Sequence, residues 1–241
     1  MAKRQALVTG ANKGIGLAIA RGLAKAGMSV WMGARDRERG EKAVAQLKDE
    51  GLDVQLLEID VADEASVLQA AAKLSGEIGV LHVLINNAGI LVDRTSPPSQ
   101  LQMKDIKATF EVNFFGPIRV TQAFVPLLKA AGNARIVMMG SGVGSLTLIT
   151  DPTSIFSSVN FLDYTASKVA LNAVTVSFAK ELEPFGIKVN AVEPGHVRTD
   201  INDNTGVVTP DEGAATALNM ALVGNDGPTG GFFGSHGRQP W

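Results

Sequence analysis

The sequence predicts one α/β domain over residues 1–241, with a doubly wound, mostly parallel sheet of seven strands and helices on both faces. Three observations support this prediction. Short apolar runs alternate with longer segments of helical periodicity along the whole chain of 241 residues. Several of these runs, such as ALV, VLI and IVMM, are continuously apolar, which is typical of strands buried on both faces. The first run also enters a glycine-rich turn that leads into a helix.

The expected elements follow one another in a regular order. Strands are expected at residues 4–10, 28–34, 54–60, 80–89, 134–140, 187–195 and 230–233. Helices are expected at residues 15–26, 37–50, 64–77, 101–131, 164–183 and 210–223. Two prolines, Pro117 and Pro126, should bend the longest helix, because proline removes a helical hydrogen bond. Strands that alternate with helices in this way predict repeated βαβ units and a parallel sheet.

Composition and charge exclude several classes of protein. Apolar residues make up 45% of the chain and charged residues 19%, which is ordinary for a globular protein with a sizeable core. The formal net charge of −2 predicts no basic surface for nucleic acid. No run of 18 apolar residues occurs, so we expect no membrane span.

The reactive side chains narrow the chemistry further. The chain has no cysteine, which excludes disulfides, thiolate catalysis and thiolate metal sites. Its three histidines do not share a metal-ligand spacing, so no metal site is expected. The first residues, MAKRQALVTG, enter a strand without a signal segment. Together these features lead us to expect a cytoplasmic protein.

The turn after the first strand reads TGANKGIG, with glycines at positions 10, 14 and 16. Glycine permits a tight turn and lets a diphosphate approach the backbone, while the following helix offers unpaired N–H groups. The spacing differs from a Walker A loop, because no Gly-Lys-Ser/Thr follows. A glycine-rich turn without a ligand is the alternative. In its strand–turn–helix context, the motif favours a Rossmann-type dinucleotide site.

Four motifs carry a resemblance to a known family. TGANKGIG (9–16), NNAG (86–89), YTASK (164–168) and PGHVRTD (194–200) occur in the order and positions of the short-chain dehydrogenase/reductase family. The chain resembles this family over nearly its whole length, and NKGIG together with GARDRERG is most similar to the carbonyl-reductase branch. The resemblance implies reversible, NADPH-dependent reduction of a small-molecule ketone or aldehyde to an alcohol.

The only tyrosine of the chain, Tyr164, precedes Lys168 by four positions, so a helix places both side chains on one face. A free tyrosine has a pKa of about 10, and a nearby ammonium group lowers it. The resemblance implies that Tyr164 is the general acid and base, and that Lys168 also binds the nicotinamide ribose. A surface Tyr–Lys pair is the structural alternative.

Two further residues match the catalytic set of the family. The resemblance assigns Ser141 to the substrate carbonyl and Asn113 to a water in a relay toward Lys168. Taken alone, Ser141 reads as a turn residue between glycines, and Asn113 reads as a helix residue satisfied by backbone. The long loop at 145–163 precedes Tyr164 and should flank the substrate.

The resemblance also implies a set of cofactor-binding residues. Within it, Asp60 would contact the adenine, and Val197 and Thr199 would hold the carboxamide end. The full set is Gly10, Asn12, Lys13, Gly14, Ile15, Gly16, Arg35, Asp60, Val61, Asn87, Ala88, Gly89, Tyr164, Lys168, Pro194, Gly195, Val197 and Thr199. For Asp60, a helix cap at a strand end is the alternative.

The end of the second strand bears on the choice between NADP and NAD. Ala34 stands where NAD enzymes place an acid, and Arg35 follows it. Arg35 and Lys13 would give the 2′-phosphate charge-assisted hydrogen bonds, which favours NADP. In the alternative, Asp36 takes the acidic role and the enzyme uses NAD.

Other functions and assemblies stay open at this stage. A non-catalytic, dinucleotide-sensing module would lack one of the four catalytic residues, and all four are present. A serine hydrolase needs a Gly-x-Ser-x-Gly elbow, but Met139 and Val143 occupy the glycine positions around Ser141. The resemblance is compatible with a homodimer or a homotetramer.

Overall fold

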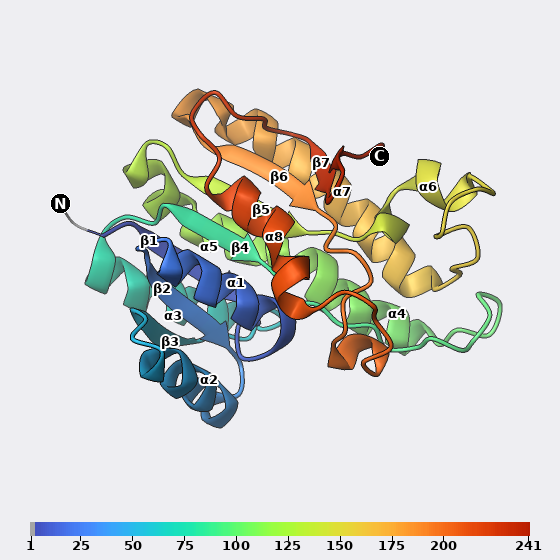
Figure 1. The fold of residues 1–241 in the computed structure, drawn as a ribbon, viewed down its shortest axis with the longest axis horizontal. Helices are drawn as coiled ribbons and strands as arrows, with labels where there is room; N and C mark the ends of the chain where they lie inside the picture. Colours follow the sequence, from blue (N-terminus) through green and yellow to red (C-terminus); the bar gives the residue numbers. More distant parts are fainter. Residues whose placement is uncertain (1–2) are drawn as a thin grey trace.

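The computed structural model describes residues 3–241 and contains an eight-stranded sheet with helices on both of its faces (Figure 1). The strand order is β3-β2-β1-β4-β5-β6-β7-β8. The strands are β1 (Gln5–Thr9), β2 (Ser29–Ala34), β3 (Val54–Glu58), β4 (Val83–Asn86), β5 (Arg135–Met139), β6 (Lys188–Val192), β7 (Phe232–Gly234) and β8 (Gly237–Arg238). The seven predicted strands are confirmed and run parallel, and the unpredicted β8 pairs antiparallel with β7.

The predicted helices are also present, with small shifts at their ends. They are α1 (Gly14–Lys25), α2 (Arg37–Asp49), α3 (Glu64–Ile78), α4 (Met103–Phe110), α5 (Gly116–Ala131), α7 (Leu162–Leu182) and α8 (Pro210–Ala221). A short helix, α6 (Leu146–Thr150), lies within the segment expected to be a loop, and Ser145 caps it by accepting a hydrogen bond from the Leu148 backbone N–H at 3.1 Å.

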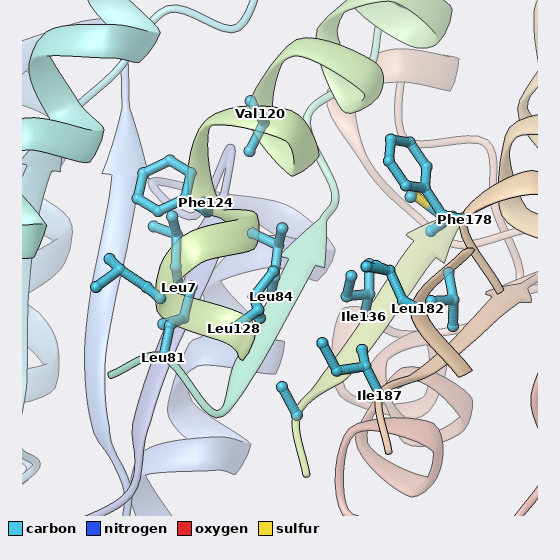
Figure 2. Close-up of a cluster of buried hydrophobic side chains, with 14 of the residues drawn as sticks. Leu7, Leu81, Leu84, Val120, Phe124, Leu128, Ile136, Phe178, Leu182 and Ile187 are labelled. Carbon is cyan, nitrogen blue, oxygen red and sulfur yellow. The ribbon is translucent and has the colours of Figure 1, made fainter. Parts of the chain in front are cut away.

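The core consists of two apolar layers, one on each face of the sheet. Figure 2 shows part of the layer beneath α5 and α7, where Phe124 and Leu128 pack toward Leu7 and Leu84 of the sheet. Helix α3 contributes to the same layer, and α1, α2 and α8 cover the opposite face. Because both faces are covered, the strands must be apolar on both sides, as their sequences are.

The segment expected to form one long bent helix contains an irregular turn. A π-helical turn at Glu111–Phe115 joins α4 to α5 just before Pro117. Pro117 has no N–H group to donate to the carbonyl of Asn113, four residues earlier, and its ring crowds that carbonyl. A wider, π-helical turn relieves this clash. Pro126 is accommodated inside α5.

The chain order reverses at β1, which has β2 on one side and β4 on the other. The carboxyl ends of β1 and β4 therefore border a crevice, the usual ligand site of such sheets. At this point the Asn87 side-chain amide donates hydrogen bonds to the carbonyls of Thr9 and Gly10, at 2.8 and 3.1 Å. In return, the Thr9 hydroxyl accepts from the backbone N–H groups of Asn87 and Ala88, both at 3.0 Å.

The glycines of this turn meet separate constraints. Gly10 and Gly14 have φ angles of +63° and +54°, in the left-handed region that favours glycine. At Gly16 the constraint is space, because an added Cβ would lie 2.3 Å from the Gly10 carbonyl oxygen and 2.5 Å from the Asn87 amide nitrogen. The chain therefore needs glycine at position 16 even though its backbone angles are ordinary.

We predict that Gly16→Ala lowers the free energy of unfolding by about 1–3 kcal/mol, the usual cost of forcing extra atoms into a packed site. Urea denaturation measures this change. Gly76→Ala is the matched control, because Gly76 lies in α3 with no atom within 4 Å of an added Cβ. It should leave stability unchanged or raise it by up to about 1 kcal/mol. Equal effects of the two substitutions would contradict the steric argument.

Candidate active site

A cleft of about 600 Å³ lies at the carboxyl ends of the strands. Its walls come from the β1–α1 turn, the ends of β2 and β3, and the loops after β4 and β6. The predicted cofactor residues that line it are Gly10, Asn12, Lys13, Gly14, Ile15, Gly16, Arg35, Asp60, Val61, Asn87, Ala88, Gly89 and Thr199. The topology therefore brings together segments that are far apart in the sequence.

The β1–α1 turn suits a diphosphate on its own geometry. No side chain caps the N-terminus of α1, so its first N–H groups point into the cleft without a side-chain acceptor. Gly14, Ile15 and Gly16 all line the cleft, so the first residues of the helix border it. The positive end of a helix dipole and exposed N–H groups together favour a phosphate group. The residues present thus fit a dinucleotide.

The charged residues at the end of β2 have separate positions. Arg35 is exposed and lines the cleft, whereas Asp36 does not line it. Asp36 is the N-cap of α2, where it accepts a hydrogen bond from the Arg39 backbone at 3.0 Å and pairs with the Arg39 side chain at 3.2 Å. Asp36 is therefore engaged by α2, while Arg35 faces the cleft.

Asp60 lines the cleft and does not cap α3. One of its carboxylate oxygens accepts from the Ala62 backbone at 3.0 Å, which closes a local turn. Asp63 is the residue that caps α3, through the Ala65 backbone N–H at 2.9 Å. The alternative of a helix cap at Asp60 is therefore wrong.

Tyr164 and Lys168 lie on the first two turns of α7, behind the inner end of the cleft. Lys168 is 4% exposed, and its ammonium group donates to the Met139 carbonyl at 2.8 Å. The same nitrogen lies 5.4 Å from the centre of the Tyr164 ring. A methyl group added to Gly89 would lie 3.7 Å from this nitrogen, so only glycine at that position separates Lys168 from the cleft.

Burial controls the protonation of this pair. It lowers the pKa of Lys168 to about 8, because the protein interior solvates an ammonium group less well than water does. Burial also raises the pKa of Tyr164 to about 12, and a hydrogen bond with Ser141 acts in the opposite direction. The expected lowering of the Tyr164 pKa by Lys168 is not found, because desolvation of the phenolate is the largest cause of the shift and Lys168 is not among its causes.

The Asn113 side chain is fully buried and supports the loop after β4. Its amide accepts from the Ile90 backbone N–H and donates to the Ile90 carbonyl, both at 2.8 Å. Its second N–H donates to the Ser167 hydroxyl at 3.1 Å. Both amide N–H groups are thus used, and any bond from Asn113 to a relay water would have to involve its oxygen atoms.

Ser141 lies beside Tyr164, at the start of the segment that leads to α6. The next residue, Gly142, is covered by the Phe156 ring, because an added Cβ there would lie 2.1 Å from a ring atom. Phe156 thereby ties the loop at 145–163 to the Ser141 turn. The neighbouring Ile155 is 82% exposed, so this loop presents apolar surface next to the candidate catalytic residues.

The motif after β6 is only partly in the cleft. Thr199 lines the cleft, but Pro194, Gly195 and Val197 of the same motif do not. The candidate catalytic residues Ser141, Tyr164 and Lys168 do not line the cleft either and lie behind it. Val197 is 3% exposed, its carbonyl accepts from the Asn202 side chain at 2.8 Å, and its N–H donates to the Gly195 carbonyl at 3.0 Å. Its backbone is thus bonded within the loop, and its expected role at the carboxamide end stays a prediction.

Sequence reasoning missed several residues of the cleft wall. They are Ile59, Ile90, Leu91, Arg94, Val112, Arg198, Asp200, Ile201, Asn204 and Pro210. Arg94 connects two loops, because its guanidinium group donates to the Asp203 carboxylate and to the Ile201 carbonyl. The position of these loops after β4 and β6 was a usable signal, but no motif singled out the individual side chains.

Within residues 3–241, no group of three or more histidine, cysteine or acidic residues is placed to hold a metal ion. In the same part of the chain, none of the helices combines the length and the apolar character needed to span a bilayer.

Comparison with known proteins gives consistent matches. The family model described as short chain dehydrogenase matches residues 4–207. The chain is 32% identical to carbonyl reductase [NADPH] 1 of Rattus norvegicus, over 98% of both chains. It is 31% identical to a (+)-neomenthol dehydrogenase of Capsicum annuum, over 95% of both.

A solved structure shows the same relationship in three dimensions. The NADPH-bound carbonyl reductase from chicken fatty liver matches with a TM-score of 0.87 and 29% identity, over 100% of both chains. The family match, the relatives and the fold agree with one another. The chain belongs to the short-chain dehydrogenase/reductase family, whose members are oxidoreductases that use a nicotinamide dinucleotide.

Proposed function

We propose that this protein is an NADPH-dependent carbonyl reductase that converts a ketone or an aldehyde to an alcohol. The observation that carries the proposal is the convergence of Ser141, Tyr164 and Lys168 behind Gly89, at the inner end of a cleft suited to a dinucleotide. The names of the relatives, which include an NADPH-linked carbonyl reductase, support the same reaction.

The proposed mechanism assigns one task to each side chain. When bound, NADPH supplies a hydride for the carbonyl carbon. The Ser141 hydroxyl holds the carbonyl oxygen beside Tyr164, which donates its phenolic proton to that oxygen. The Lys168 ammonium group then stabilises the phenolate that Tyr164 becomes.

The pKa values favour the reductive direction near neutral pH. Because the pKa of Tyr164 is raised to about 12, its side chain is a phenol at pH 7 and ready to donate a proton. Because the pKa of Lys168 is about 8, most of its side chains still carry a charge at pH 7. The reverse reaction, alcohol oxidation, needs the phenolate and should become faster at higher pH.

The charges at the outer end of the cleft support NADP over NAD. Arg35 and Lys13 line the cleft and can meet a 2′-phosphate. Asp36, the residue that would favour NAD, is occupied as the N-cap of α2 and stands outside the cleft. This arrangement makes the NAD-dependent alternative the weaker one.

The loop at 145–163 supports a substrate with an apolar body. Phe156 covers Gly142 next to Ser141, and Ile155 on the same loop exposes an aliphatic side chain. Burial of apolar substrate surface against such a wall is favourable. The relative named for neomenthol, an apolar cyclic alcohol, agrees with this class.

The first functional prediction concerns Tyr164. Tyr164→Phe should lower kcat by about 10²- to 10⁴-fold, the usual contribution of a general acid, while the dissociation constant of NADPH stays the same. Steady-state kinetics and fluorescence titration measure the two quantities. Ser141→Ala should also lower turnover without weakening NADPH binding. A Tyr164→Phe enzyme that retains more than about a tenth of the parent rate would exclude Tyr164 as the proton donor.

The second prediction concerns pH. Loss of the Lys168 proton removes the charge that stabilises the phenolate, so kcat/KM for NADPH in the reduction should fall as pH rises through about 8. A pH–rate profile between pH 6 and pH 10 measures this midpoint. In Lys168→Arg the side chain stays charged, so whatever activity remains should lose this fall. A fall that persists with the same midpoint in Lys168→Arg would assign the ionisation to another group.

The third prediction concerns cofactor preference. Arg35→Ala should raise the dissociation constant of NADPH by about tenfold and leave that of NADH nearly unchanged, since only NADPH carries the 2′-phosphate. Raising the salt concentration should weaken NADPH binding to the parent more than NADH binding. Arg37→Ala is the control, because the Arg37 side chain pairs with Glu41 at 2.8 Å and does not line the cleft. A parent enzyme that binds NADH more tightly would refute the NADP proposal.

A further inference from the structure

The loop after β6 places an acidic residue against the cation that faces the cofactor site. The Asp200 carboxylate accepts a hydrogen bond from the Lys13 ammonium group at 2.6 Å. Both residues line the cleft, although they are 187 positions apart in the chain. Lys13 is the residue just before α1 in the glycine-rich turn, and Asp200 begins the short 3₁₀ turn Asp200–Asn202.

The surrounding charges place Asp200 near the outer end of the cleft. Lys13 lowers the pKa of Asp200 most strongly, and the positive charge of Arg39 on α2 adds to that effect. Arg39 lies on the first turn of α2, close in the sequence to Arg35, which follows the end of β2. The Asp200 carboxylate therefore faces Lys13, one of the two cations to which the proposed function assigns the 2′-phosphate.

The position of the loop does not depend on this ion pair. Thr199 and Asn202 close a capping box around the turn, with reciprocal side-chain and backbone hydrogen bonds. Arg94 holds the next residues through the Asp203 carboxylate and the Ile201 carbonyl. Removal of the Asp200 charge should thus leave the backbone of the loop in place.

Two anions at this site must compete for Lys13. The side chains of Lys13 and Asp200 are 58% and 64% exposed, so water screens their attraction and an exchange of partners costs little. A 2′-phosphate that approaches Lys13 also meets the like charge of Asp200, which repels it. NADH has no group at this position and is not affected by either interaction.

We infer that Asp200 is a specificity-determining residue that pairs with Lys13 and thereby weakens the binding of the 2′-phosphate of NADPH. Lys13 exchanges Asp200 for the phosphate when NADPH binds and returns to Asp200 when the oxidised cofactor leaves. This inference rests on the proposed NADP-dependent function, because it concerns the phosphate that distinguishes NADPH from NADH.

The test is direct titration of the protein with NADPH and with NADH, followed by cofactor fluorescence. Asp200→Asn should lower the dissociation constant of NADPH by about two- to fivefold, the range expected for an exposed charge pair, and leave that of NADH unchanged. Asp203→Asn is the matched control, since Asp203 lies on the same loop and pairs with Arg94 rather than Lys13. It should not change the ratio of the two dissociation constants.

A double-mutant cycle shows whether Asp200 acts through Lys13. In a Lys13→Met background, the part of the Asp200→Asn effect that arises from the shared ammonium group should disappear. If the parent prefers NADPH and Asp200→Asn binds NADPH no more tightly than the parent does, the inference about Asp200 is wrong, but the proposed NADP-dependent function is not affected. The same gain in the Asp203→Asn control would also overturn it. A parent that does not prefer NADPH would overturn the proposed NADP-dependent function together with it.

Discussion

The contact between Asn87 and the β1–α1 turn determines the geometry of the whole site. The Asn87 amide closes the turn by binding two of its carbonyls, and Thr9 binds back to the loop after β4. Gly16 makes room for this amide, since no other side chain fits between the Gly10 carbonyl and Asn87. Because β1 and β4 are neighbours at the reversal of chain order, this junction joins the glycine-rich turn to the loop that faces the candidate catalytic residues.

Desolvation is the second physical constraint on the site. Lys168 is deeply buried behind Gly89, and its ammonium group retains one hydrogen bond, to the Met139 carbonyl. The same burial that lowers the pKa of Lys168 raises that of Tyr164, so each side chain is shifted away from its charged form. The phenolate that forms when Tyr164 releases its proton depends strongly on the nearby ammonium group for its stability, since the low-dielectric surroundings strengthen the attraction between the two charges. Burial thus couples the two residues more tightly than their helical spacing alone does.

Most of the fold could be predicted from the sequence, because continuously apolar runs and helical periodicity report burial directly. Strand β8 was missed since a strand of two residues leaves no pattern. The segment LTLIT of α6 was read as loop because five residues contain too little periodicity to indicate a helix. The π-helical turn was foreseen only as a bend, since Pro117 shows that a hydrogen bond is lost but not how the backbone adjusts.

The candidate site was predictable to the extent that local motifs carry it. The glycine turn and the Tyr164–Lys168 pair lie within short segments whose backbone geometry follows from their own residues. The pairing of Lys13 with Asp200 joins residues that are 187 positions apart, so only the folded chain reveals it. The direction of the Tyr164 pKa shift was missed for a similar reason, because it depends on how the folded chain removes the phenol from water. The spacing of residues indicates which groups meet, whereas burial sets their relative energies.

The two halves of the cleft differ in what holds them in place, and this difference bears on specificity. The half proposed to hold the dinucleotide is built on the ends of β1 to β4, and of these strands β1, β2 and β4 have a paired strand on each side. The half proposed to hold the substrate depends on loops that a few distant contacts connect, such as Arg94 with Asp203 and Phe156 with Gly142. Loops on a rigid scaffold can change their side chains without disturbing the core. Under the proposed function, the same cofactor chemistry could therefore serve different carbonyl substrates, because the loops that would shape the substrate site lie outside the sheet.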